Sequence, residues 1–125
     1  MAARKKQRAG KLGVTPARLE KLALALPGAE AGTSYGTPAY RVRKKLFARL
    51  REEGDTVVVK IDFEDRESFH RGDPKTFFWT DHYENYPMML VQLDRVHPED
   101  LRELLENAWR QEAGKRLVAE FDAKA

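Results

Sequence analysis

Cysteine is absent from this chain of 125 residues. Its absence excludes disulfides, thiolate nucleophiles and zinc–thiolate sites, and it is compatible with a reducing cytoplasm, which is the location we predict. Long apolar runs are absent as well, since none approaches the ~20 residues needed to cross a bilayer. No apolar signal core follows the cationic residues near the start. We therefore expect neither a secretory signal nor a membrane partner.

Acidic residues are absent from two stretches that are rich in cations. Residues 31–51 contain six basic side chains and no acidic one. The first eleven residues contain five further cations and no acid, and we expect residues 1–13 to form a disordered basic tail. Residues 52–125, in contrast, carry ten basic and eighteen acidic side chains. Any affinity for nucleic acid must therefore come from the basic stretch, with the tail as an electrostatic arm, and not from the overall charge.

The hydrophobic patterns predict a single α+β domain over residues 14–125. Thr15-Pro16 provides an N-cap and a first-turn proline, and leucines at helical spacing follow until Pro27-Gly28 ends the helix. The Gly-, Ala-, Ser- and Thr-rich residues 29–38 are typical of a connection. Alternating residues then predict a hairpin with its turn at Lys44-Lys45, followed by a third strand over residues 57–63.

The second half of the chain predicts the rest of a two-layer fold. A polar helix is expected near residues 64–71, and two short strands near 77–80 and 88–93 flank an aromatic loop. A long helix follows from Pro98, with a further short helix around Leu117 and Phe121. Together these elements predict a five-stranded antiparallel sheet with helices on one side. The expected core places four residues beneath Leu101, Leu104 and Leu105 of the long helix, namely Val57, Val59, Ile61 and Leu90.

Several blocks in a fixed order resemble the MmcQ/YjbR family of small DNA-binding-like proteins. The matching blocks are Ser34–Arg43, Lys45–Leu50, Thr80–Tyr83, Tyr86–Met88, Leu90–Leu93, Ala108–Arg110 and Lys115–Leu117. The resemblance implies a two-layer α+β fold similar to the secretion-chaperone-like, or double-wing, architecture. It also implies DNA binding, while the chaperone-like architecture equally implies a protein-binding surface. Family members commonly have glycine in the hairpin turn, where this chain has Lys44-Lys45.

The basic hairpin is the candidate nucleic-acid-binding surface. Strict alternation would place cations on one sheet face, with an exposed Phe47 among them to stack on bases. The candidate residues are Arg41, Arg43, Lys44, Lys45, Phe47, Arg49, Arg51 and Lys60. We expect sequence-nonspecific binding of nucleic acid, DNA in the first place. Two alternatives stay open: a solvated face whose charges prevent strand pairing, and a protein-interaction module that binds an acidic partner.

The loop from Thr80 to Tyr86 is the candidate pocket, because it collects His82, Tyr83 and Tyr86. A structural role for these residues is the favoured interpretation, since no positioned third partner accompanies them. His70 and His97 do not give a zinc-like spacing, so no metal site is predicted. Trp79 and Trp109 lie within apolar patterns and are expected in the core. No set of residues combines a nucleophile, a base and an orienting group, so we expect neither enzymatic activity nor a cofactor.

Overall fold

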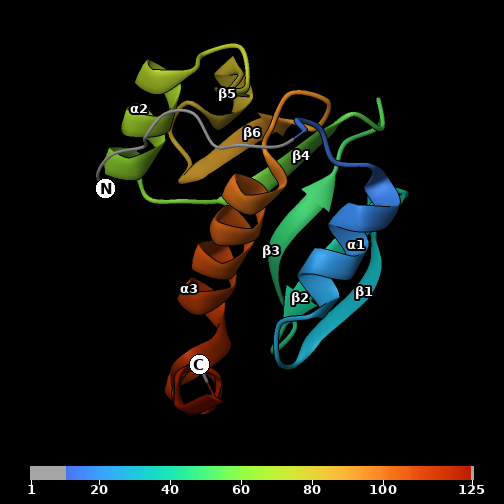
Figure 1. Cartoon of the computed structure of the whole chain (residues 1–125), viewed down its shortest axis with the longest axis vertical. Helices are drawn as coiled ribbons and strands as arrows, with labels where there is room; N and C mark the ends of the chain where they lie inside the picture. Colours follow the sequence, from blue (N-terminus) through green and yellow to red (C-terminus); the bar gives the residue numbers. More distant parts are fainter. Residues whose placement is uncertain (1–10, 125) are drawn as a thin grey trace.

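A six-stranded antiparallel sheet, covered on one face by two helices, forms the domain in the computed structural model, which describes residues 11–124 (Figure 1). The strands, in the spatial order β1-β2-β3-β4-β6-β5, are β1 Ala29–Ser34, β2 Thr37–Val42, β3 Lys45–Leu50, β4 Thr56–Lys60, β5 Phe77–Phe78 and β6 Met88–Gln92. The helices are α1 Pro16–Leu24, α2 Phe63–Gly72 and α3 Pro98–Lys124, with a short 3-10 helix, η1, at Asp81–Tyr83. The predicted α+β class and antiparallel sheet are confirmed, but the prediction of five strands is wrong.

The additional strand is β1, in a segment that the sequence predicted to be a connection. β1 pairs with β2 from Ala29 opposite Val42 to Ser34 opposite Thr37. Tyr35 and Gly36 form the turn between them, with φ angles of 55° and 81°. The strand lies at the edge of the sheet and is largely exposed, so it carries no hydrophobic alternation. Its extended conformation comes from pairing with β2, which a local pattern does not record.

The N-terminal edge of the domain begins at the end of the predicted tail. The amide of Gly13 donates to Val96 O at 2.7 Å, and that of Val14 donates to Leu93 O at 2.8 Å. Thr15 then caps α1 by accepting a hydrogen bond from the Arg18 amide. Residues 1–10 of the predicted tail lie outside the described residues. No helix within residues 11–124 is long and apolar enough to span a membrane.

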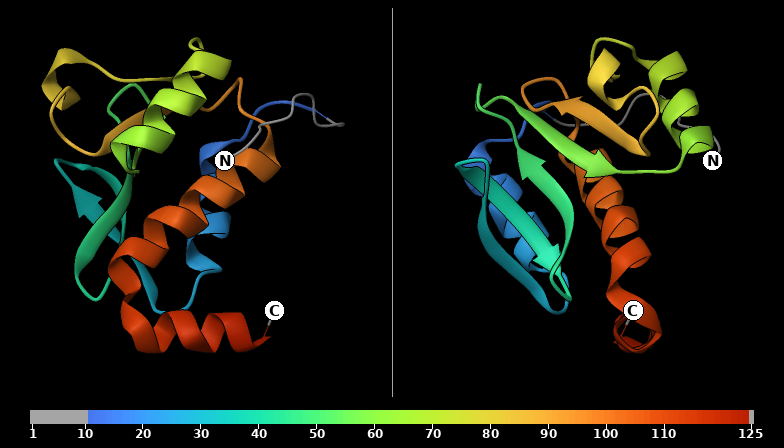
Figure 2. Two further views of the ribbon diagram at one scale, coloured as in Figure 1. Left: turned by 90° about the vertical axis from the view of Figure 1, so that its left-hand side faces the viewer. Right: turned by 180° about the vertical axis from the view of Figure 1, so that it is seen from behind.

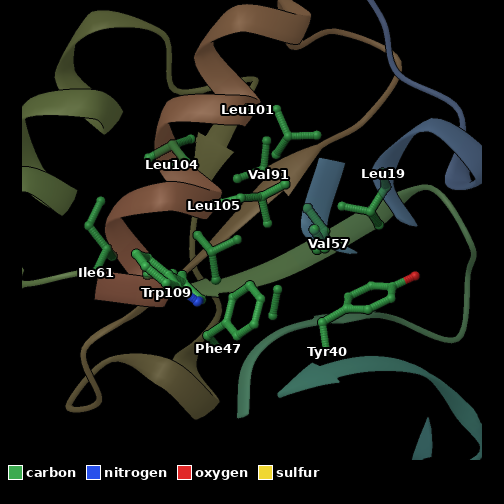
Figure 3. Packing of buried hydrophobic residues seen from close by; sticks show 14 of the residues in the cluster. Leu19, Tyr40, Phe47, Val57, Ile61, Val91, Leu101, Leu104, Leu105 and Trp109 are labelled. Atoms are coloured by element: carbon green, nitrogen blue, oxygen red, sulfur yellow. The ribbon is translucent and has the colours of Figure 1, made fainter. Parts of the chain in front are cut away.

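The core lies between the sheet and the pair α1 and α3, while α2 packs against β5 and β6 (Figures 1 and 3). Val57, Val59 and Ile61 are buried with the three leucines of α3, as predicted. Leu90 is buried as well, but it lies opposite Val58 on the other face of the sheet, outside this cluster. The expectation for Leu90 was therefore wrong. Met88 to Val91 are all apolar, so alternation could not reveal which of them face the helices.

Helix α3 is interrupted at Gly114, where φ is 86° and ψ is 159°. The two parts correspond to the long helix and the short helix predicted from the sequence. Trp109, on the first part, is fully buried and donates from Nε1 to Pro27 O at 2.8 Å, so its predicted core position is confirmed. The ring of Phe121, on the second part, lies 5.2 Å from the Trp109 ring. This contact folds the end of the helix back toward the core.

Candidate functional site

The basic hairpin does not present all its predicted residues on one face. Tyr40 pairs with Ala48, but the next pair is Arg41 with Leu46, so Phe47 is an extra residue in β3. This β-bulge turns Phe47 into the core, where its side chain is fully buried (Figure 3). The prediction of an exposed Phe47 for base stacking is therefore wrong. A bulge shifts the alternation by one residue, and the sequence carries no mark of it here.

Several of the predicted cations already have partners within the domain. Arg49 is only 9% exposed and donates from Nη1 to Thr37 Oγ1 at 3.3 Å. Lys60 Nζ lies 2.7 Å from Glu112 Oε2 of α3, and Arg51 Nε lies 3.8 Å from Glu53 Oε1. Arg41 is half-buried on β2. These four residues are therefore less available to phosphates than the alternation predicted.

The most exposed cations of the hairpin lie at its turn. Arg43 and Lys44 are the two turn residues, with left-handed φ angles of 53° and 68°, and Lys45 begins β3 opposite Val42. The turn thus lies one residue earlier than predicted. Left-handed backbone costs a residue other than glycine about 1 kcal/mol or more, so the glycine common in the resembling family would fit here with less strain. All three cations are exposed.

The interruption of α3 lies against this turn. A Cβ at position 114 would be 2.7 Å from Arg43 Nη1, so only glycine leaves room for the guanidinium in this position. A cavity of about 550 Å³ opens beside it. Its lining contains three cations and no acid, and consists of Arg43, Ala113, Gly114, Lys115, Arg116 and Leu117. Figure 2 shows the β2–β3 turn and the bend of α3 at the same end of the molecule.

We call the five cations at this end the basic surface: Arg43, Lys44, Lys45, Lys115 and Arg116. All five are exposed, and the ion pairs found in the described part of the chain include none of them. Lys115 and Arg116 were not predicted as site residues from the sequence. The sequence feature that could have indicated them is Gly114, which disfavours helix late in a predicted helical segment and is directly followed by these two cations. Only the fold brings them beside the hairpin turn, about 70 residues earlier in the sequence.

The aromatic loop is held in place by Arg66 of α2. This arginine is 4% exposed, although it lies in a helix that the sequence marks as polar. Its Nη1 donates to the carbonyls of Tyr83, Tyr86 and Met88 at 2.9, 3.0 and 3.1 Å. Its Nη2 donates to the carbonyl of Glu84 at 2.9 Å. One guanidinium thus satisfies four carbonyls and fixes the path of the loop.

Trp79 also belongs to this arrangement and not to the core, contrary to the prediction. It is half-buried, and its ring centre lies 4.0 Å from the guanidinium carbon of Arg66. Trp79 Nε1 donates to Glu84 Oε1 at 3.0 Å. The His70 ring packs on the same indole at 4.8 Å, while His70 Nδ1 lies 2.8 Å from Phe77 O. His70 therefore has a structural role beside the loop.

The three predicted pocket residues do come together. His82, Tyr83 and Tyr86 line a groove of about 300 Å³. We call it the aromatic groove, and its full lining is Lys60, His82, Tyr83, Tyr86, Pro87 and Met88. The His82 ring centre lies 4.7 Å from that of Tyr83 and 6.2 Å from that of Tyr86. Among residues 11–124, no group of three or more histidine, aspartate or glutamate residues is arranged to hold a metal ion.

Comparison with known proteins identifies the family. A sequence model of the YjbR family matches residues 24–111, which include the basic hairpin and the aromatic loop. The chain belongs to the YjbR family. The YjbR match ends before Gly114, so Lys115 and Arg116 of the basic surface lie outside it.

The related proteins bear on the fold of this chain and not on its function. Uncharacterized proteins of Mycobacterium bovis and Mycobacterium tuberculosis are 36% identical over 73 residues, or 58% of this chain. The match spans 57% of the length of each of these relatives. The crystal structure of a Deinococcus radiodurans protein with a DUF419 domain is similar, with a TM-score of 0.67 and 21% identity over 76% of this chain and 75% of that one. At this identity the likeness shows a shared fold.

Proposed function

We propose that this YjbR-family protein binds nucleic acid, DNA in the first place, through the basic surface and without catalysing a reaction. The supporting observation is that cations from the β2–β3 turn and from the bend of α3 meet around one cavity whose lining has no acid. Phosphate neutralisation by lysine and arginine supplies essentially all of the affinity in nonspecific binding. The basic surface offers this chemistry although residues 52–125, which supply Lys115 and Arg116, carry an excess of acidic side chains.

The shape of the basic surface favours binding without sequence preference. Its cations lie at a hairpin turn and at a helix bend, where they reach backbone phosphates more readily than base edges in a groove. The proposal includes the double-wing interpretation, with the β2–β3 hairpin, which ends at Arg43-Lys44, as the wing that contacts the nucleic acid. It also includes a cytoplasmic location, with which the absence of cysteine is compatible.

Salt dependence of binding tests the proposal. We would measure fluorescence anisotropy of a labelled 20-base-pair duplex against salt concentration. If about five phosphates are neutralised, log affinity should fall against log salt with a slope of roughly −4 to −5. The variant Lys115→Ala/Arg116→Ala should weaken binding and reduce the slope by about two. A matched control is Arg71→Ala/Lys75→Ala, which removes two exposed cations elsewhere and should leave the slope nearly unchanged.

The same measurement distinguishes the alternatives. Repeating the Lys115 and Arg116 substitutions in a chain without residues 1–10 separates the basic surface from the cationic N-terminal residues. If deletion of residues 1–10 abolishes binding while the double substitution has no effect, the basic surface is not the binding site. If the duplex does not bind at low salt but an acidic polypeptide such as polyglutamate does, the protein is instead an interaction module for an acidic protein partner.

A further inference from the structure

One ion pair links the aromatic groove to the part of α3 that forms the basic surface. Lys60 lines the aromatic groove, and its Nζ is paired with Glu112 Oε2 at 2.7 Å. Glu112 directly precedes Ala113 and Gly114, which line the cavity of the basic surface. Adjacent residues of a helix are separated by about 1.5 Å along its axis, so the Lys60–Glu112 pair links the lining of the groove to the helix segment that lines the cavity. One extended ligand can therefore occupy both.

The aromatic groove presents rings and few free backbone acceptors. The carbonyls of Tyr83, Tyr86 and Met88 already accept hydrogen bonds from Arg66. An extended peptide that relies on main-chain hydrogen bonds would find these acceptors occupied. Tyr86 is 57% exposed and lines the groove together with His82 and Tyr83. Ring faces on a loop that is already ordered suit a flat ligand, because little conformational freedom is lost on binding.

The charges around the aromatic groove give the ligand a direction. Asp81 and Glu84 lie exposed on the loop, so phosphates are disfavoured on that side. Lys60 lies on the side that leads to the basic surface. A strand with its phosphates on the basic surface and an unpaired base over the aromatic rings matches both the charges and the ring faces. Bases within a duplex are paired and stacked and cannot enter such a groove without unpairing.

We propose that the nucleic acid bound by this protein is single-stranded, with one base stacked in the aromatic groove against Tyr86 while phosphates further along the same strand contact the basic surface. This inference rests on the proposed function, because the basic surface supplies the phosphate contacts. Aromatic platforms of this kind accept any base, since every base has a π face. The binding remains nonspecific in sequence but becomes selective for unpaired strands.

Anisotropy titrations with labelled dT12, U12 and a 12-base-pair duplex test this inference. The variant Tyr86→Ala should weaken binding of dT12 or U12 by roughly 5- to 150-fold, the usual range for one stacked base, and leave duplex binding unchanged. Tyr86→Phe should retain single-strand binding, because the ring is kept. Tyr35→Asn is the matched control: Tyr35 is 85% exposed but lies outside the groove, and asparagine tolerates its left-handed backbone.

The outcomes separate this inference from the proposed function. Loss of single-strand binding in Tyr86→Ala, with Tyr35→Asn unaffected, supports a stacked base. If both single strands and the duplex bind equally, depend on Lys115 and Arg116, and ignore Tyr86→Ala, nucleic-acid binding stands and the stacked base is refuted. If neither single strands nor duplex bind, the proposed function fails and this inference fails with it.

Discussion

The guanidinium of Arg66 lies over the indole of Trp79, with 4.0 Å between the guanidinium carbon and the ring centre. The same group donates to three carbonyls of the aromatic loop and to that of Met88 at the start of β6. A single side chain from α2 thus positions the aromatic groove without contributing to its lining. Cation–π packing and charge-assisted hydrogen bonds both strengthen when the group is removed from water, as it is here.

Replacing Arg66 with alanine should lower the free energy of unfolding by about 2 to 4 kcal/mol, because the loop carbonyls lose their donor. Arg66→Lys should rescue this only in part, since an ammonium lacks the planar fork that reaches all four acceptors. Urea titration followed by circular dichroism measures the change. Arg71→Ala, at an exposed position of the same helix, should change the free energy by less than about 0.5 kcal/mol. An equal effect of the two alanine variants would show that Arg66 does not support the loop.

Truncation of Leu104 tests the packing of α3 against the sheet. Leu104 is 2% exposed within the core cluster. Leu104→Ala should therefore lower the free energy of unfolding by about 2 to 5 kcal/mol, as for other buried leucines. Leu24→Ala, where the leucine of α1 is 38% exposed, should cost less than about 1 kcal/mol in the same urea titration. A loss below about 0.5 kcal/mol for Leu104→Ala would place this side chain outside the core.

Tyr40 should make the free energy of unfolding of the domain fall as the pH rises above 10. Burial, followed by the nearby Glu20 carboxylate, raises the pKa of Tyr40 from 10.0 to about 12. Because the unfolded chain releases this proton at a lower pH, the stabilisation is complete below pH 10 and is lost as pH rises toward 12. Phenolate absorbance should show one tyrosine titrating near pH 12, absent in Tyr40→Phe. A titration of the wild-type protein without such a late step would contradict the burial of the phenol beside Glu20.

Asp122 should make the second part of α3 sensitive to acid. A hydrogen bond from Arg110, 2.6 Å from Asp122 Oδ1, lowers the pKa of the Asp122 carboxyl below its usual 3.8. The pair therefore supports residues 115–124 above about pH 4 and is lost as the pH falls through the lowered pKa. The protection factors of these amides against hydrogen exchange, which are corrected for the intrinsic pH dependence of exchange, should fall at low pH. In Asp122→Asn the acid-dependent step should be missing, whereas Glu120→Gln should retain it; identical profiles for all three proteins would refute this linkage.

The sequence predicted those elements whose signals are local. Thr15-Pro16 marks the start of α1, and the β-branched run from Val57 to Val59, continued by the alternation of Lys60 with Ile61, marks β4. The β-bulge at Phe47 was not predictable, because it depends on how β3 pairs with β2. Arg66 was equally hidden: in sequence it is one more charge on a polar helix, and only the loop that folds over it shows that it is buried.

The candidate site was partly predictable for the same reason. His82, Tyr83 and Tyr86 are close in sequence, and the structure places them around one groove. The basic surface, in contrast, joins Arg43 to Lys115 and Arg116, which only the packing of α3 against the sheet brings together. The density of positive charge along the chain identified the hairpin. It could not show which of the predicted cations form hydrogen bonds or ion pairs inside the domain.

The hydrogen bond from Trp109 to the carbonyl of Pro27 has a consequence for biosynthesis. It joins residues separated by 82 positions, and Trp109 is fully buried. At about 5 to 20 residues per second, a ribosome needs roughly 4 to 16 seconds to add the intervening chain. During that interval the nascent α1 and β-hairpins lack the helix that covers their apolar face. Chaperones that shelter nascent chains should therefore engage this protein until α3 has left the exit tunnel.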